Sequence, residues 1–312
     1  MLIQKEATMT AQPQKRKRPS GVQLAEWRDG WLFATPFLLG IIIFWLGPML
    51  YSLFLVTQDW DMLGSPQFVG LANITNALAD PLVEKSLYNT AYYTFIGVPL
   101  QLIIALLLAV ALNQNLRGQS VYRTIFYLPA ITPAVAFAVV WMQIFNADFG
   151  VLNNILRVFG IPGIKWLFDP DIAKPAFILM SLWTVGPQMV IFLAGLQSVP
   201  VELLEAAEID GASSWQRFWG VVMPMLSPVV FFNLIIGIIG SFQIFTNAFI
   251  MTNGGPQNST LFVVLYIYLN GFRFFKMGYA ATLAWVLFWI IMFFSFLQFT
   301  VANRWVYYEG KV

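Results

Sequence analysis

Long apolar stretches without a charged residue alternate with short polar segments along most of the chain. A helix needs about 20 consecutive apolar residues to cross the hydrocarbon core of a bilayer. Stretches of sufficient length cover residues 31–57, 86–116, 124–147, 175–201, 218–272 and 277–303. The fifth could hold more than one helix, but the turn-forming sequence TNGGPQN at 252–258 divides it. The pattern therefore predicts six spans, with an outside loop and a re-entrant or interfacial segment near 260–270 after the fifth.

The six spans are expected to be helices, because a segment isolated in lipid must satisfy its own backbone hydrogen bonds. A barrel would need strands of about 10 residues with alternating polarity, and the sequence shows no such alternation. The sequence thus predicts an all-α integral membrane protein with spans at about 31–57, 88–113, 124–146, 175–198, 226–251 and 279–302. Proline inside a span favours a kink. Five such prolines indicate either irregular packing or helices that bend around a cavity: Pro48, Pro99, Pro129, Pro133 and Pro187.

Composition supports lipid as the solvent for much of the surface. The 312 residues are 59% hydrophobic and 10% charged, whereas an average soluble domain has about 25% charged residues. The chain has no His and no Cys, and no ionisable residue lies well inside a predicted span. These absences argue against a proton-coupled transporter, a charged-ring channel, thiol chemistry and a His/Cys metal site. The sequence also lacks a phosphate-binding G-x-x-x-x-G-K-[ST] loop, so we expect no cofactor on this chain, no enzyme activity and an energy source on another subunit.

The distribution of basic residues predicts the topology. The cluster at 15–18 precedes the first span, and basic residues are retained on the cytoplasmic side. The first apolar run is longer than the 7–15 residues of a signal-peptide core, and no cleavage site follows it, so we expect it to remain. The prediction is a partly disordered basic cytoplasmic tail at 1–30, a transmembrane domain at 31–303 and a second cytoplasmic tail at 304–312.

A polar insert at 200–228 separates the fourth and fifth predicted spans. Pro200 and Glu205 suit the start of a short helix, and Gly211 can end it in a left-handed conformation. Ser213 and Gln216 have capping-box spacing for a second helix that runs toward the fifth span. The insert is thus predicted to be a helix–glycine–helix hairpin on the cytoplasmic side. It could be a purely structural interfacial hairpin or a contact for a soluble partner.

This insert resembles the EAA loop of binding-protein-dependent ABC importer permeases. The matching residues are Glu205-Ala206-Ala207, Asp210-Gly211-Ala212, Phe218, Pro224 and Pro228. Three further elements resemble the maltose and multiple-sugar branch of these MetI-like permeases: FVGLAN at 68–73, FQIF at 242–245 with MTNGGP at 251–256, and MGYAA at 277–281. The chain is most similar to the first, MalF-like permease type, in its shorter six-span form. The resemblance implies the type I ABC importer permease fold.

The resemblance also implies partner subunits and ATP hydrolysis as the energy source for transport. The loop at 200–228 would form a coupling helix that docks in a cleft of a cytoplasmic ATPase, with Glu205 paired to a basic residue and Gly211 permitting the close turn. The implied coupling residues are Glu205, Ala206, Ala207, Asp210, Gly211, Ala212, Phe218 and Pro224. A second permease subunit as heterodimer partner, two ATPase copies carrying ATP and Mg, and an extracytoplasmic solute-binding protein would complete the importer. The importer would work by alternating access in a bacterial or archaeal cytoplasmic membrane. No nucleic-acid partner is expected.

The resemblance places a substrate site midway across the membrane, on the fourth and fifth spans. The candidate residues are Ser181, Trp183, Thr184, Gln188, Gln243, Thr246 and Asn247. Hydroxyl and amide groups beside an aromatic ring suit a neutral, hydroxyl-rich sugar. The alternative is that these polar side chains bond to neighbouring helices and that Trp183 only packs. Two other functions remain open at this point: the same family with a cargo such as glycerol phosphate, or an ATP-independent secondary transporter.

Overall fold

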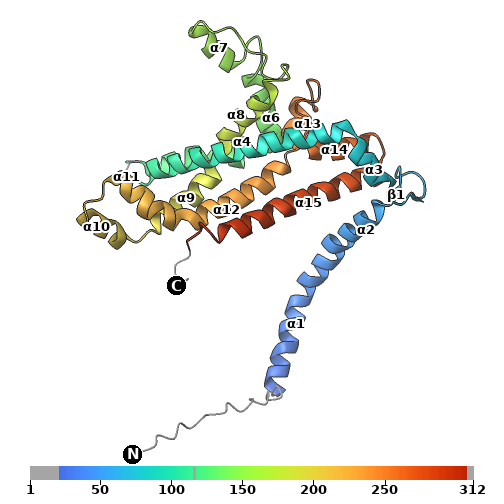
Figure 1. Cartoon of the computed structure of the whole chain (residues 1–312), viewed down its shortest axis with the longest axis horizontal. Coiled ribbons are helices and arrows are strands. Elements are labelled where there is room, and N and C mark those ends of the chain that lie inside the picture. Colours follow the sequence, from blue (N-terminus) through green and yellow to red (C-terminus); the bar gives the residue numbers. More distant parts are fainter. Residues whose placement is uncertain (1–20, 115–116, 308–312) are drawn as a thin grey trace, which may run out of the picture. The chain divides into compact units, whose positions relative to one another are not determined.

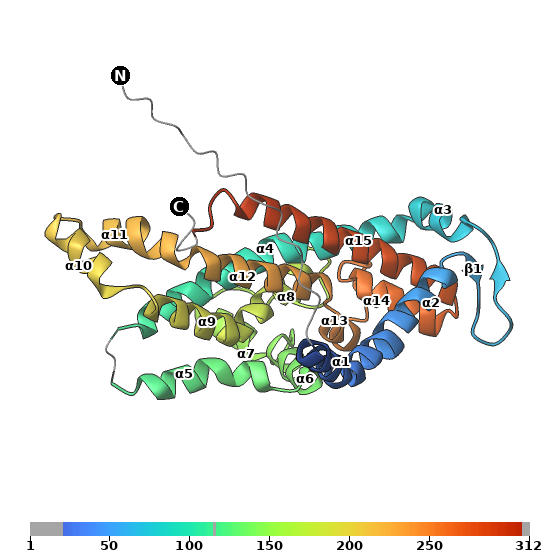
Figure 2. The same cartoon turned by 90° about the horizontal axis from the view of Figure 1, so that it is seen from below.

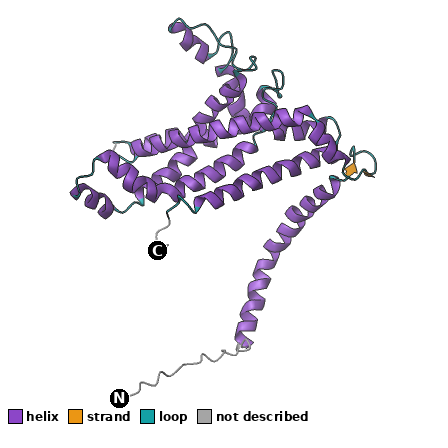
Figure 3. Cartoon of the chain, viewed as in Figure 1, coloured by secondary structure: helices purple, strands orange, loops and turns teal. Residues whose placement is uncertain are grey.

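The computed structural model describes residues 21–114 and 117–307, and these are helical almost throughout (Figure 3). Of the predicted cytoplasmic tails at 1–30 and 304–312, residues 1–20 and 308–312 lie outside the described residues, and residues 21–30 are helical. The α-helices are α1 Gly21–Ile41, α2 Gly47–Leu55, α3 Ala72–Ala79, α4 Pro81–Leu112, α5 Gln119–Tyr127, α6 Ala134–Ile144, α7 Val151–Val158, α8 Ala173–Ser181, α9 Gly186–Gln197, α10 Val201–Ile209, α11 Ser214–Arg217, α12 Met223–Phe242, α13 Thr246–Met251, α14 Val263–Tyr268 and α15 Met277–Ala302. Two short strands, β1 Gln58–Asp59 and β2 Gln67–Phe68, pair antiparallel. The prediction of an all-α membrane protein is confirmed.

Short 3-10 and π segments join several of these helices. The 3-10 segments are η2 Leu128–Ile131 and η3 Leu182–Thr184, and the π segments are η1 Ile42–Leu46, η4 Phe218–Val222 and η5 Leu269–Arg273. The residues up to Ser52 form one compact unit and those from Leu53 onward form another. The first unit is a continuous helical run of α1, η1 and the start of α2. It begins before the predicted span at 31, because residues 21–30 mix polar and apolar side chains and contain no proline to stop a helix.

Four to six helical segments are long and apolar enough to cross a membrane. Within the described residues, four runs qualify alone: Gly21–Leu55, Pro81–Leu112, Ser214–Met251 and Met277–Ala302. Two bent pairs qualify jointly, with bends of 99° between Gln119–Ile131 and Ala134–Ile144 and of 49° between Ala173–Thr184 and Gly186–Gln197. The bends lie beside Pro129, Pro133 and Pro187, where proline removes helix hydrogen bonds. The number of spans is six only if each bent pair counts as one.

The second unit packs around α4. This long helix contacts α9, α12 and α8, while α15 packs against α12 and α14. In Figures 1 and 2, α4, α12 and α15 lie side by side, with α10 and α11 at one end of the unit and α3 and β1 at the other. The candidate functional residues therefore lie on elements along the whole length of this unit.

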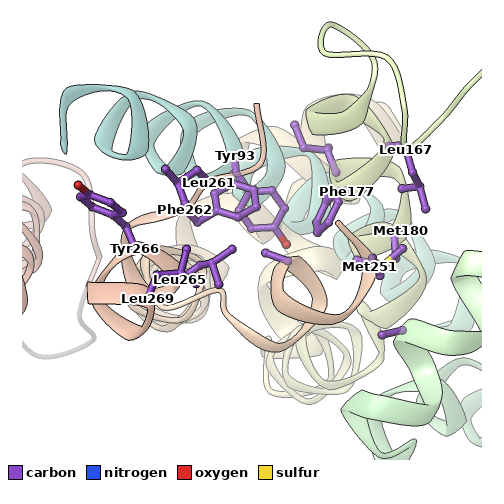
Figure 4. Packing of buried hydrophobic residues seen from close by; sticks show 14 of the residues in the cluster. Tyr93, Leu167, Phe177, Met180, Met251, Leu261, Phe262, Leu265, Tyr266 and Leu269 are labelled. Atoms are coloured by element: carbon purple, nitrogen blue, oxygen red, sulfur yellow. The ribbon is translucent and has the colours of Figure 1, made fainter. Parts of the chain in front are cut away.

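Two buried clusters hold this unit together. One joins α4, α8, α13 and α14 through residues such as Tyr93, Phe177 and Phe262, where Phe262 packs edge-on against Tyr93 with ring centroids 5.5 Å apart (Figure 4). The other joins α4, α9 and α12. Here Gly195 allows close approach, because a Cβ at this position would lie 2.7 Å from Leu226 Cδ1. The segment predicted as re-entrant or interfacial forms α14 and η5, and its side chains are largely buried in the first cluster.

Candidate functional site

The polar insert forms the predicted helix–glycine–helix hairpin. Helix α10 ends at Gly211, whose φ of +81° is the left-handed conformation that glycine adopts without strain. The Gly211 amide donates to the Glu208 carbonyl at 3.0 Å, and the Ala212 amide donates to the Ala207 carbonyl at 2.9 Å. These two bonds define a Schellman motif, which satisfies the last carbonyls of α10. The turn is therefore a fixed corner.

The second helix of the hairpin starts with the predicted capping box. The Ser213 amide donates to Gln216 Oε1 at 2.8 Å, and the Gln216 amide donates to Ser213 Oγ at 3.4 Å. From Ser214 the chain stays helical through α11, η4 and α12 as far as Phe242. An ion pair between Arg217 and Glu208 links the two arms across the corner. The sequence reasoning missed this pair, although opposite charges on either side of a glycine corner were a signal for it.

Most of the predicted coupling residues are accessible. The residues Glu205, Ala206, Asp210 and Gly211 are exposed, as is Pro224. Ala207, Ala212 and Phe218 are half-buried. The hairpin also exposes large apolar groups, with Ile209 86% and Trp215 70% accessible. A rigid hairpin with an exposed acidic and apolar surface is suited to docking on another protein.

Five of the seven predicted substrate residues line one cavity. It has a volume of about 440 Å³, within the range of about 300–1,000 Å³ usual for ligand pockets. The five are Ser181, Thr184, Gln188, Thr246 and Asn247. They come from α8, η3, α9 and α13, and the bend between α8 and α9 lies among the first three of these segments. The substrate role of these residues stays a prediction.

Two acceptors in this cavity have no partner. Gln188 Oε1 and Asn247 Oδ1 are buried and form no hydrogen bond with the described residues. Leaving a buried polar atom unpaired costs about 1–3 kcal/mol, and such atoms are uncommon in native structures. By contrast, Ser181 Oγ donates to the Ile178 carbonyl at 2.6 Å and accepts from Gln101 Nε2 at 2.8 Å. Gln188 and Asn247 are therefore the residues best prepared to bind a ligand.

Trp183 and Gln243 lie outside this cavity. Segment η3 is a 3-10 turn, in which residues three apart share a face. Ser181 and Thr184 therefore point into the cavity while Trp183 points away, 61% exposed and edge-on to Trp141 at 6.3 Å. Trp183 instead lines a separate apolar pocket of about 450 Å³. Gln243 is the exposed residue that ends α12.

The cavity also contains residues that the sequence reasoning missed. Tyr93 and Gln101 reach it from α4, and Gly237, Gly240 and Ser241 reach it from α12. Gln101 was detectable as an amide inside an apolar run, but nothing in the pattern placed it opposite Ser181. No lining residue carries a formal charge at neutral pH. The cavity is suited to binding a neutral polar molecule through hydroxyl and amide groups.

These features define a multi-pass helical membrane protein with a cavity between its helices and a rigid, exposed hairpin at one end. Residues 101–307 match the family described as "Binding-protein-dependent transport system inner membrane component", and the chain belongs to this family. As the family's description states, its members depend on a binding protein. The chain is a transport permease subunit of the ABC type and not an enzyme.

Similar proteins cover nearly the whole chain. It is 41% identical over 287 residues to the probable ABC transporter permease YesP of Bacillus subtilis, covering 90% of this chain and 93% of that protein. It is 40% identical to the lactose transport permease LacF of Rhizobium radiobacter, covering 88% and 94%. Among solved structures, a chain of a bacterial alginate ABC transporter superposes with a TM-score of 0.79 at 20% identity, covering 90% and 96%. That structure supports the fold.

Proposed function

We propose that this chain carries a neutral mono- or oligosaccharide through the cavity that contains Gln188 and Asn247. The observation that carries the proposal is the pair of buried, unpaired amide oxygens in an uncharged cavity. A sugar hydroxyl can donate to each oxygen and so remove the cost of leaving it unpaired. The relatives named for lactose and for trehalose and maltose transport support a saccharide cargo.

A phosphorylated cargo is the second candidate. The chain is 33% identical over 291 residues to one permease named for sn-glycerol-3-phosphate transport and 34% identical over 284 residues to another. A phosphate is bound in proteins through charge-assisted hydrogen bonds from Arg or Lys. None of the described residues that line the cavity is basic. The cavity therefore favours an uncharged cargo over a phosphorylated one.

The hairpin at 200–228 is proposed as the coupling element. Its exposed Glu205 would pair with a basic residue of a separate ATPase subunit, which would bind the ATP and Mg. The Schellman corner at Gly211 keeps the hairpin rigid, and a rigid element can transmit a displacement that a flexible loop would absorb. The complete importer would contain this chain, a second permease subunit, two ATPase copies and an extracytoplasmic solute-binding protein. Both ends of the chain would lie in the cytoplasm.

Uptake by the reconstituted importer tests the cavity. We expect Gln188→Ala combined with Asn247→Ala to reduce saccharide uptake while basal ATPase activity is kept. The matched control is Gln243→Ala, because Gln243 is an amide on the adjoining segment that lies outside the cavity. Equal uptake by the double variant and the wild type would refute the site.

A second variant tests the coupling element. We expect Gly211→Asp to leave membrane insertion intact and to abolish ATPase docking and uptake, because aspartate is strained at a φ of +81°. Gly220→Ala is the control, since a Cβ at Gly220 would meet no atom within 4 Å. Normal uptake with Gly211→Asp would contradict the coupling role.

A further inference from the structure

A second polar pocket is lined by residues of β1 and α3, among others. Figure 2 shows these two elements at the end of the unit opposite the hairpin. Its volume is about 430 Å³. Two sequence motifs that the cavity and the hairpin do not use meet here. The motif at 68–73 contributes Val69, Ala72 and Asn73, and the motif at 277–281 contributes Tyr279. The pocket therefore gives these motifs a common location.

One wall of the pocket is fixed by hydrogen bonds to Asp80. Its Oδ1 accepts from the Leu82 amide at 2.8 Å. Its Oδ2 accepts from the hydroxyls of Tyr266 at 2.5 Å and Tyr279 at 2.7 Å. Burial alone would raise the pKa of Asp80, but these hydrogen bonds and nearby Lys276 hold it below the ordinary value. Asp80 is thus an ionised, positioned carboxylate whose charge is already stabilised by the protein.

The adjoining wall is fixed by Asn73. Its side chain is 7% exposed, and its Nδ2 donates to the carbonyls of Val56 at 3.0 Å and Gln58 at 2.8 Å. The start of α15 packs so tightly here that a Cβ on Gly278 would lie 1.8 Å from the Gln58 carbonyl oxygen. Asn73 Oδ1 has no hydrogen-bond donor among the described residues. The pocket is therefore preorganised and retains a free acceptor.

Three exposed side chains of the pocket form no side-chain hydrogen bond with the described residues, although Lys276 acts electrostatically on Asp80. Asp59, Asn76 and Lys276 line it, and none forms a hydrogen bond or ion pair through its side chain with the described residues. Together with Asp80 they provide two carboxylates, one ammonium and one amide. An anionic ligand would meet two negative charges, and a cationic ligand would meet Lys276. A neutral ligand that both donates and accepts hydrogen bonds would satisfy all of these groups.

We propose that this pocket is an outer saccharide site, separate from the cavity at Gln188 and Asn247. Sugar hydroxyls would donate to Asp59 and to Asn73 Oδ1 and would accept from Lys276. Val69 and Ala72 provide an apolar surface for the C–H face of a sugar ring. The proposal rests on the saccharide cargo proposed above and adds a second binding position at the end farthest from the coupling hairpin. The same chemistry would also fit the headgroup of a glycolipid, and the proposal commits to a free saccharide.

The test is saccharide titration of the full-length protein assembled with its partner permease and ATPase subunits but without the solute-binding protein, with glucose, lactose and maltose as neutral probes and glucuronate as the anionic counterpart. We expect a neutral probe to bind even when the cavity carries Gln188→Ala and Asn247→Ala. In that background, Lys276→Met is expected to weaken binding about tenfold or more, since a hydrogen bond to a charged group contributes about 1.5–3 kcal/mol. Asp59→Asn should act in the same direction. Arg273→Met is the matched control, because Arg273 is an exposed basic residue outside the pocket.

Three results would overturn the outer site. One is complete loss of saccharide binding in the cavity variant. Another is wild-type affinity in both Lys276→Met and Asp59→Asn. The third is a co-purified glycolipid that occupies the pocket and that free saccharide does not displace. Saccharide uptake by the wild type together with any of these results would refute only the outer site, whereas failure of every saccharide to support uptake would refute the proposed cargo.

Discussion

Two glycines of α12, Gly237 and Gly240, provide a test of the cavity through both stability and uptake. Both line the cavity. A Cβ added at Gly240 would meet no atom within 4 Å, whereas one at Gly237 would lie 2.9 Å from Val98 Cγ1. Val98 is buried on α4, and a β-branched side chain has little freedom to turn away. We therefore expect Gly240→Ala to be tolerated and Gly237→Ala to destabilise the protein.

The expected magnitudes follow from these two environments. Replacing glycine by alanine within a helix stabilises by about 0.5–1 kcal/mol, and this gain is common to both positions. Overpacking against Val98 costs about 1–3 kcal/mol. The difference between Gly240→Ala and Gly237→Ala in unfolding free energy should therefore be about 1–3 kcal/mol, in favour of Gly240→Ala. Gly240→Phe should fold as well, but its ring would occupy the cavity and reduce uptake.

The assay compares thermal unfolding of the purified variants with uptake in vesicles. Gly240→Ala should unfold at or above the wild-type temperature, and Gly237→Ala below it. Gly240→Phe should combine near-normal unfolding with strongly reduced uptake. If Gly240→Ala is as unstable as Gly237→Ala, the packing of α12 against α4 is wrong. Wild-type uptake by Gly240→Phe would show that cargo does not pass through this cavity.

Three further predictions concern packing, capping and ionisation. Gly186→Ala should impair folding, seen as reduced yield and thermal stability, because its Cβ would lie 2.4 Å from the Phe126 carbonyl oxygen, which belongs to the backbone. Ser213→Ala should cost about 1 kcal/mol of stability through loss of the N-cap, and Gln216→Ala should cost less, as measured by thermal unfolding. The pKa of Asp80 lies below its ordinary 3.8, so its stabilising contribution is present above pH 3.8 and is lost as the pH falls further. Unfolding temperature measured against pH should show this acid loss in the wild type and not in Asp80→Asn.

Local rules were sufficient to predict the hairpin from the sequence. The left-handed Gly211 and the capping box of Ser213 and Gln216 involve residues at most a few positions apart. The apolar stretches likewise predicted the helical spans, because the thickness of a bilayer sets the length of a spanning helix. Features that depend on one helix and its own caps are thus accessible without a structure.

The arrangement of the cavity could not be predicted in the same way. Gln101 bonds to Ser181 from another helix, and this pairing depends on how α4 and α8 pack. Trp183 was expected among the substrate residues from the family resemblance, but it lies outside the cavity, because the 3-10 turn directs Ser181 and Thr184 into it and leaves Trp183 on another face. Prolines indicated bends without indicating their angles. Directions of side chains across bent helices therefore depend on tertiary packing.

The order of these elements along the chain connects the hairpin to the residues that line the cavity. Helix α9 carries Gln188 into one wall of the cavity and leads directly into the hairpin, while the helical run from Ser214 to Phe242 leads from the hairpin to Gly240 in the facing wall. At 1.5 Å per residue, that run is about 40 Å long. The shortest covalent path between Gln188 and Gly240 passes through the Gly211 corner. In the coupling role proposed above, the Schellman motif and the capping box keep this corner stiff, so a displacement imposed on the hairpin would be transmitted along α9 and α12 to the cavity walls.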